Sequence, residues 1–474
     1  MSTLAQQHTD AHGNPTSGAR DAVERYDTAL DRLLRYHPDV VTLTASLMEN
    51  EPDFAMGQIL MGYLCLTSTD TPDLAGAQAA AAALDGIALN EREAAHRAVI
   101  GAWLDGDWHG AARQLDALLI RWPSDLLALL VGHQLDFFTG DAANLRDRVG
   151  RSFGAVDPKH PHHGFVRGMY AFGLEESGHY EQAEAHGHAA LEINPDDVWA
   201  THAVVHTYEM RGLVDTGIHF LRDREKDWAK DNLFTVHNWW HLALYLLEAE
   251  RPSDSLVIYD TQVHGELSGG VPLEMLDASA LLWRLLLDGV DTGGRFSTLA
   301  DAWATRTGDE PWYTFNDLHA VMALSGAGRI DDARSVIDRL DRYVTSGGNR
   351  DEASNVAMTA EIGLPASRAV VAFVEGRHAD VVAELAPIRA RFQRFGGSHA
   401  QRDVLQRTLL EAAILSGQLN LARALIRERL AARQFSVYAL RHQAEVLRRT
   451  GDNDAAARAD TAATANRDRF AAAV

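Results

Sequence analysis

The chain has 474 residues, more than one compact core usually contains, so we expect several domains or an extended array of repeats. Apolar residues make up 46% and charged residues 23%, which excludes a globally disordered chain. The formal net charge of −22 argues against nucleic acid as a partner, because an acidic surface repels phosphate backbones.

Positions 1–20 are polar and are predicted to form a flexible N-terminal tail. They lack the basic start and apolar middle of a secretion signal. No apolar run in the chain approaches the length of a membrane span, so we expect no membrane partner. The single cysteine, Cys65, excludes disulfides within the chain, is expected to be a buried apolar side chain, and favours a cytoplasmic location.

Glycines recur at a fixed spacing along the rest of the chain. The spacing from Gly106 to Gly140 is repeated in two later pairs, Gly178 with Gly212 and Gly417 with Gly451. Gly328 and Gly376 are out of phase, which indicates insertions within single repeats. The shared spacing matches the period of about 34 residues that is typical of tetratricopeptide repeats.

The residues around these glycines suit helical hairpins. Each glycine can end a first helix in a left-handed conformation. Small residues stand where the second helix must pack closely: Ala111, Ala183, Gly217, Ala333, Ala422 and Ala456. Strand signals are almost absent. The predicted fold class is therefore all-α, a tetratricopeptide-like α-solenoid in which antiparallel hairpins form a right-handed superhelix.

Two glycine-rich stretches are candidate breaks in this solenoid, Thr261–Pro272 and Thr345–Arg350. We expect one helical array over residues 21–260, with histidine-rich inner helices, and a second over 261–474. The two arrays can form one continuous superhelix.

Histidines are unusually frequent, at 22, and two pairs follow the repeat. His202 and His206 are four residues apart, as are His237 and His241, so each pair shares one face of a helix. The second pair follows the first by about one repeat. The two pairs should therefore lie on the first helices of consecutive hairpins, which line the concave surface.

Other chemically capable residues accompany these pairs. Asp317 and His319 are candidates for catalysis together with the four histidines. The candidates for substrate binding are Asn238, Trp239, Trp240, His163, Glu175, Glu209, His399, Arg402 and Asp403.

Three interpretations of the histidines compete. They can satisfy polar contacts between closely packed helices. They can bind a divalent metal, with His202, His206, His237 and His241 as the ligands if one is present. They can also act as general bases without a cofactor, oriented by Asp317 or Glu209. The sequence itself requires no cofactor. No Gly-x-Ser-x-Gly motif and no phosphate-binding glycine loop occur, so serine nucleophiles have no support.

Several segments carry a resemblance to a known family. Residues Trp199–Glu248, which include HNWWHLALYLLE, resemble the tetratricopeptide repeat protein 38 family. The segments ALLWRLLLDG, FNDLHAVMALSGAGR and GGSHAQRD further along the chain are similar to it as well. The resemblance implies a tetratricopeptide solenoid in a soluble, mostly cytoplasmic protein. It implies no reaction, substrate or metal, so no catalytic residue is transferred from it.

Two classes of function remain open from the sequence. The first is a His/Trp-rich concave pocket that binds a small molecule, with hydrolytic or proton-transfer chemistry. The alternative is a non-catalytic scaffold that binds a peptide or protein partner in the solenoid groove. Inner helices rich in His and Trp favour the small-molecule pocket, because grooves that bind peptide carboxylates usually present Lys, Arg and Asn. A homo-oligomer is compatible with either class.

Overall fold

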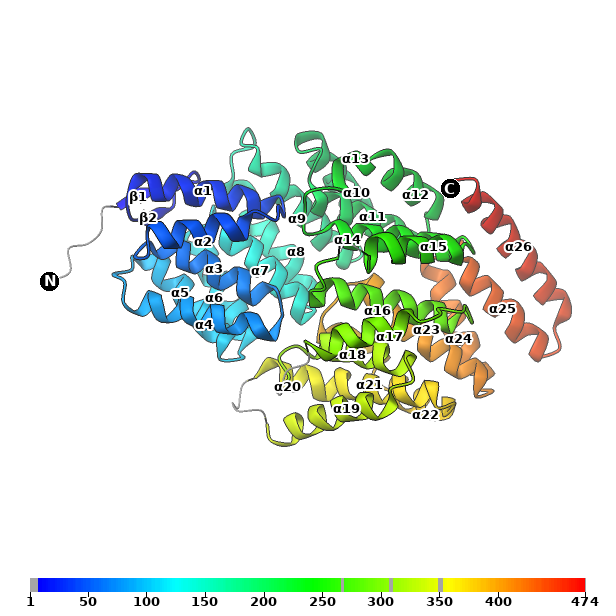
Figure 1. The fold of residues 1–474 in the computed structure, drawn as a ribbon. Helices are drawn as coiled ribbons and strands as arrows, with labels where there is room; N and C mark the ends of the chain where they lie inside the picture. Colours follow the sequence, from blue (N-terminus) through cyan, green and yellow to red (C-terminus); the bar gives the residue numbers. More distant parts are fainter. Residues whose placement is uncertain (1–6, 266–267, 307–309, 348–352, 474) are drawn as a thin grey trace. The chain divides into compact units, whose positions relative to one another are not determined.

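The computed structural model describes residues 7–265, 268–306, 310–347 and 353–473. Most of these residues are helical, and the only strands among them form one small antiparallel hairpin (Figure 1). The all-α fold class is therefore confirmed, and its building blocks are tetratricopeptide-like pairs of helices.

By contact density the chain separates into two compact units. Unit 1 comprises Met1–Val204, Lys230–Thr235 and Val344–Ala357, and unit 2 comprises Val205–Ala229, Val236–Tyr343 and Met358–Val474. This division differs from the predicted boundary near residue 260. The glycine-rich stretch Thr261–Pro272 connects two helices within unit 2 instead. The second predicted break, Thr345–Arg350, lies partly outside the described residues.

Unit 1 begins with strands β1 and β2 and continues through helix pairs that pack side by side, such as α5 with α6 and α9 with α10. Its elements are β1 (Gln7–Thr9), β2 (Pro15–Ser17), α1 (Arg20–Leu34), α2 (Val40–Asn50), α3 (Ala55–Thr67), α4 (Leu74–Asp85), α5 (Glu91–Leu104), α6 (Trp108–Arg121), α7 (Leu126–Thr139), α8 (Ala142–Ser152), α9 (His162–Glu176), α10 (Tyr180–Ile193), the first half of α11 (Val198–Arg211) and, much later in the chain, most of α20 (Ser354–Met358).

Unit 2 contains the remaining helices, again largely paired, as α21 with α22 and α25 with α26. Its α-helices are the second half of α11, α12 (Val214–Asp223), α13 (Glu225–Trp228), α14 (Thr235–Glu248), α15 (Pro252–Ile258), α16 (Pro272–Leu287), α17 (Arg295–Ala304), α18 (Thr314–Gly326), most of α19 (Ile330–Thr345), α21 (Leu364–Val374), α22 (His378–Leu385), α23 (His399–Leu415), α24 (Leu419–Ala432), α25 (Val437–Arg449) and α26 (Asn453–Ala471). Short π- or 3-10-helical segments also belong to it: Tyr259–Val263, Thr359–Gly363 and Arg389–Phe395.

The repeat chemistry holds in both units. Gly106 and Gly140, with the other six predicted turn glycines, have positive φ angles at the ends of first helices, where a side chain would be strained. The predicted small residues are buried; at Gly217, a Cβ atom would lie 2.3 Å from the ring of Tyr245 on α14. Glycine is required there for α12 to approach α14.

First and second helices of the hairpins differ in burial. In α14, every residue from Asn238 to Leu247 is buried, whereas in α19 only Ala333, Val336 and Leu340 are. A helix buried on all sides lies within the core, and a helix with one apolar stripe covers it. The second histidine pair, His237 and His241, therefore lies on a helix of the core.

Two predictions about the chain ends and apolar runs need correction. The predicted flexible tail is structured from Gln7, because Asp10 and Thr16 of the hairpin are buried against Arg92 of α5. One helical stretch, Ser354–Val374, is long and apolar enough to span a membrane by length and composition. However, 61% of its apolar window is buried inside the protein, as in a core helix.

Candidate metal centre

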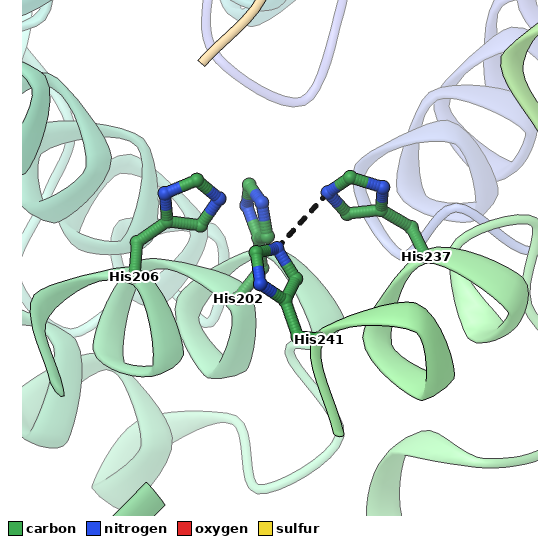
Figure 2. Close-up of side chains that lie close together, drawn as sticks. All are labelled: His202, His206, His237 and His241. Carbon is green, nitrogen blue, oxygen red and sulfur yellow. Dashed lines mark hydrogen bonds between the residues drawn. The ribbon is translucent and has the colours of Figure 1, made fainter. Parts of the chain in front are cut away.

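Three histidines of unit 2 converge at the packed inner helices α11 and α14. His206 projects from α11, and His237 and His241 project one turn apart from α14 (Figure 2). Each offers one ring nitrogen, and these nitrogens lie within 4.8 Å of one another. We call these three residues the histidine triad. Figure 2 also shows His202, one turn before His206 on α11, in the part of that helix that belongs to unit 1.

Two carboxylates fix the orientation of the α14 rings. His237 Nδ1 lies 2.6 Å from Asp277 Oδ2 on α16, and His241 Nδ1 lies 3.0 Å from Glu209 Oε2 on α11. An ionised carboxylate only accepts hydrogen bonds, so both Nδ1 atoms carry the proton and donate it. Each Nε2 atom then presents a lone pair, which is the form in which histidine binds a metal.

The two Nε2 atoms face each other at 3.2 Å. Two nitrogen ligands of a tetrahedral zinc ion, each about 2.0–2.1 Å from the metal, lie about 3.3 Å apart. Two lone pairs at this distance repel unless a cation lies between them, either a metal ion or a proton shared by the rings. The geometry therefore suits a bound cation.

Burial disfavours the proton as that cation. Burial holds the pKa of His206 well below its usual value, and the neighbouring His241 lowers it further. The pKa of His241 is lowered in the same way, first by burial and then by His237 and Arg284. The side chain of His237 is 12% exposed and that of Glu209 is 11% exposed, so the triad reaches solvent on this side.

Aromatic and polar neighbours hold the triad in place. The ring of Trp240 stacks on His237 with centroids 5.1 Å apart, and Arg284 of α16 lies 5.5 Å from the centre of the Trp240 ring. Gln401 of α23 donates to the second oxygen of Asp277 at 3.4 Å. These contacts restrict the rings to one arrangement, as a metal site needs.

The structure brings some of the predicted site residues to the triad. Glu209 and Trp240 contact it directly, and His399 on α23 is near enough to lower the pKa of His206. Asp403 lies in the same unit and binds Arg429 with both oxygens.

Other predicted residues are engaged elsewhere. Trp239 points to another side of α14 and packs on Trp228 with ring centroids 4.9 Å apart. Asn238, its neighbour, is fully buried on α14. Arg402 donates to the carbonyl of Gly397.

Asp317 and His319 on α18 also have other contacts. Asp317 pairs with Arg339 at 3.1 Å, and burial raises its pKa to about 6 against the pull of that arginine. His319 donates to the carbonyl of Phe315, and burial lowers its pKa to about 4. Their catalytic roles stay predictions.

Three predicted residues belong to unit 1. His163 and Glu175 lie on α9, and His202 packs there against Phe172, Trp199 and Phe234, with ring centroids 4.9–5.0 Å away. Unit 1 also has a second histidine group, His12, His160 and His162. His12 and the hairpin that carries it were not expected to be ordered.

Asp277 and Arg284 were not predicted from the sequence. Both are buried on α16 and are seven residues apart, which places them on one face of the helix. An acidic and a basic residue at that spacing within a mostly apolar helix were a usable signal.

Comparisons with known proteins add little to this picture. No protein-family model matches the chain. Among solved structures, the chain is similar to human IFIT1, solved as a dimer with m7Gppp-AAAA, at 11% identity over 94% of this chain and 89% of that one, with a TM-score of 0.36.

It is also similar to the P58(IPK) TPR domain, at 12% identity over 81% of this chain and 97% of that one, with a TM-score of 0.21. A third similarity is to Naa15/Naa10 bound to HypK-THB, at 12% identity over 94% of this chain and 63% of that one, with a TM-score of 0.24. None of the three reaches a TM-score of 0.5, so the fold assignment rests on the helices and turns described above.

Proposed function

We propose that the histidine triad binds a divalent metal ion of the zinc type and that unit 2 uses it to hydrolyse a small molecule. The observation that supports this most directly is the pair of Nε2 lone pairs at 3.2 Å, each fixed by a carboxylate on the opposite ring nitrogen. Imidazole ligands suit zinc, copper, nickel and iron. Three protein ligands with one open position are typical of catalytic rather than structural zinc.

The chemistry follows from such a metal ion. A zinc ion lowers the pKa of its bound water to about 7, which supplies a nucleophile at neutral pH. The open position would face the solvent side of His237 and Glu209, where substrate can enter. Glu209 and Asp277 act on the ligands rather than on the substrate, because each holds a histidine ring in its metal-binding form.

The family resemblance fits the same residues. The most specific resembling segment, HNWWHLALY, carries His237, Trp240 and His241. We therefore also propose that the chain belongs to the tetratricopeptide repeat protein 38 family. A cytoplasmic location is proposed with it, since the chain has a single cysteine, Cys65, and therefore no disulfide within it.

The test is the metal content of untagged protein after reconstitution with zinc and removal of excess ion, measured by plasma mass spectrometry. We expect about one zinc ion per chain that is lost in the His206→Ala/His241→Ala double variant. His237→Gln, a smaller change, should weaken binding without unfolding the protein. His160→Ala is the matched control, because it removes a half-exposed histidine of the other histidine group.

The outcomes separate the functions. Zinc lost in both triad variants but retained in His160→Ala supports the metal centre. Zinc-free wild-type protein would refute it and leave two alternatives, metal-free acid–base chemistry on His237 or the scaffold that binds a peptide or protein. The helical-repeat fold suits such a binding role as well.

A further inference from the structure

A small cavity lies next to the histidine triad inside unit 2. Its volume is about 30 Å³, and it is bounded by α11, α12, α14, α16 and α23–α25. That volume admits water or a group of a few atoms but not a whole metabolite. Glu209 belongs to both sites, since one of its oxygens binds His241 and its side chain lines the cavity.

The lining of the cavity is rich in arginine. Four arginines and three acidic residues line it: Arg284, Arg407, Arg429, Arg433, Glu209, Glu248 and Asp403. Two of the arginines are neutralised: Arg429 contacts both oxygens of Asp403, and Arg407 contacts both oxygens of Asp288, outside the lining.

The charge of Arg433 is only partly balanced. Its guanidinium lies 3.4 Å from Asp403, which Arg429 already occupies, and 3.9 Å from Glu209, which already binds His241. Arg433 is 8% exposed, so water does little to screen it.

Arg284 is the least compensated of the four. It is 1% exposed, and its two terminal nitrogens donate to the carbonyls of Ala280 and Ala400. Burial lowers the pKa of Arg284 to about 10; the attraction of Asp403 raises it only in part, since the repulsion of Arg407 acts against that attraction. A buried guanidinium with carbonyl partners in place of a carboxylate is costly unless an anion approaches it.

Two further guanidinium nitrogens also lack an acceptor. Within the described residues, the buried Nε atoms of Arg407 and Arg429 have no hydrogen-bond acceptor. Buried donors are normally satisfied, by protein atoms, water or a ligand. An oxyanion has several acceptor oxygens and matches the planar fork of arginine.

We infer that this cavity binds the oxyanion group, a carboxylate or phosphoryl group, of the substrate whose hydrolysis we propose at the neighbouring triad. The anion site itself is inferred from the cavity alone. That the anion is part of a substrate rests on the function proposed above. The inference narrows the substrate class to small anionic molecules in which the hydrolysable bond lies close to the charged group.

The test uses inorganic phosphate and acetate as probes, titrated by calorimetry into full-length protein at constant ionic strength, with and without zinc. The variants are Arg284→Met and Arg433→Gln. Arg284→Lys keeps the charge but loses the fork, and Arg458→Gln removes an exposed arginine of α26 as the matched control. Circular dichroism checks that each variant is folded.

We expect one of the two anions to bind zinc-free wild-type protein. Its affinity should fall at least tenfold in Arg284→Met and in Arg433→Gln, less in Arg284→Lys, and stay within twofold in Arg458→Gln. Binding retained in the zinc-free His206→Ala/His241→Ala variant would support the anion site even if the metal centre failed. The relative affinities of phosphate and acetate identify which oxyanion the site prefers.

Two results would overturn the inference. The first is that neither phosphate nor acetate, at millimolar concentration, binds folded zinc-free protein. The second is binding that requires zinc and is unchanged in both arginine variants. The anion would then be a ligand of the metal, so the proposed function would stand and the anion site would not.

Discussion

Asp277 offers the sharpest test of the metal centre, because it touches the proposed ligand but not the metal. Asp277→Asn keeps the size of the side chain and removes its charge. The carboxylate is fully buried and lies 2.6 Å from His237 Nδ1, so its effect is little screened by solvent. In the variant, the new side-chain amide can donate as well as accept a hydrogen bond, so the proton of the His237 ring need not be on Nδ1. The tautomer with the proton on Nε2, which cannot bind metal, becomes accessible.

The expected loss follows from that change of tautomer. Removing the carboxylate partner of a metal-binding histidine usually weakens metal affinity by about 10–100-fold. That corresponds to about 1.4–2.7 kcal/mol. We expect the upper part of the range, since Gln401 holds the other oxygen of Asp277 and limits rearrangement. Competition with a chromogenic zinc chelator at pH 7 measures the affinity directly.

Asp317→Asn is the matched control for this variant. Asp317 is also a buried carboxylate of unit 2, but it pairs with Arg339 on α19. Its replacement should destabilise the protein without changing zinc affinity by more than about twofold. If Asp277→Asn binds zinc as tightly as wild-type protein while remaining folded, His237 is not a ligand and the triad is not a metal site.

Three further predictions concern stability. Gly217→Ala should lower the free energy of unfolding, measured in urea, by roughly 1–3 kcal/mol, since the new Cβ would overlap the Tyr245 ring. Gly154→Ala is the control: its Cβ would meet open space, so the free energy of unfolding should change by less than about 0.5 kcal/mol. His319 has a folded pKa of about 4, below its unfolded value, so its contribution is complete above about pH 6.5 and is lost as the pH falls towards 4. Wild-type protein should therefore lose about 2–3 kcal/mol more than His319→Gln between pH 6.5 and pH 4.5 in urea titrations, and equal losses would contradict this. Arg92→Met should cost about 3–5 kcal/mol and expose the N-terminal hairpin to limited proteolysis, because Asp10 and Asp125 would be left buried without their cation; unchanged proteolysis would show that the hairpin is held by other contacts.

The repeat chemistry made the fold predictable. Gly106 and Gly140, and the pairs that follow them, are local signals, since a left-handed residue at a helix end needs glycine wherever it occurs. The same period already predicts that His206 and His241 lie on neighbouring inner helices. The closeness of His206 and His241 follows from this period, because equivalent positions of consecutive repeats lie next to each other.

The parts that were not predictable depend on distant partners. Asp277 is 40 residues from His237, in a helix whose start follows a glycine-rich stretch that interrupts the period, so its register was not fixed. Trp239 and Trp240 are adjacent in sequence but point to different sides of α14, and only Trp240 faces the triad. The N-terminal tail looked disordered because its partner, Arg92, lies far along the sequence, on α5.

The discontinuous composition of unit 1 has a consequence for how the chain can be made and divided. Leu233 donates its N–H to the carbonyl of Tyr36, and Ser354 bonds to Gly106 and His109, so residues beyond 204 complete unit 1. On the ribosome, the contacts of Ser354 form only after residue 354 has emerged, so unit 1 is completed only after much of unit 2 has been synthesised. A fragment cut at Val204 would lack those partners. We therefore expect the two units to be expressed and degraded together, and not to occur as separate domains that are exchanged between proteins.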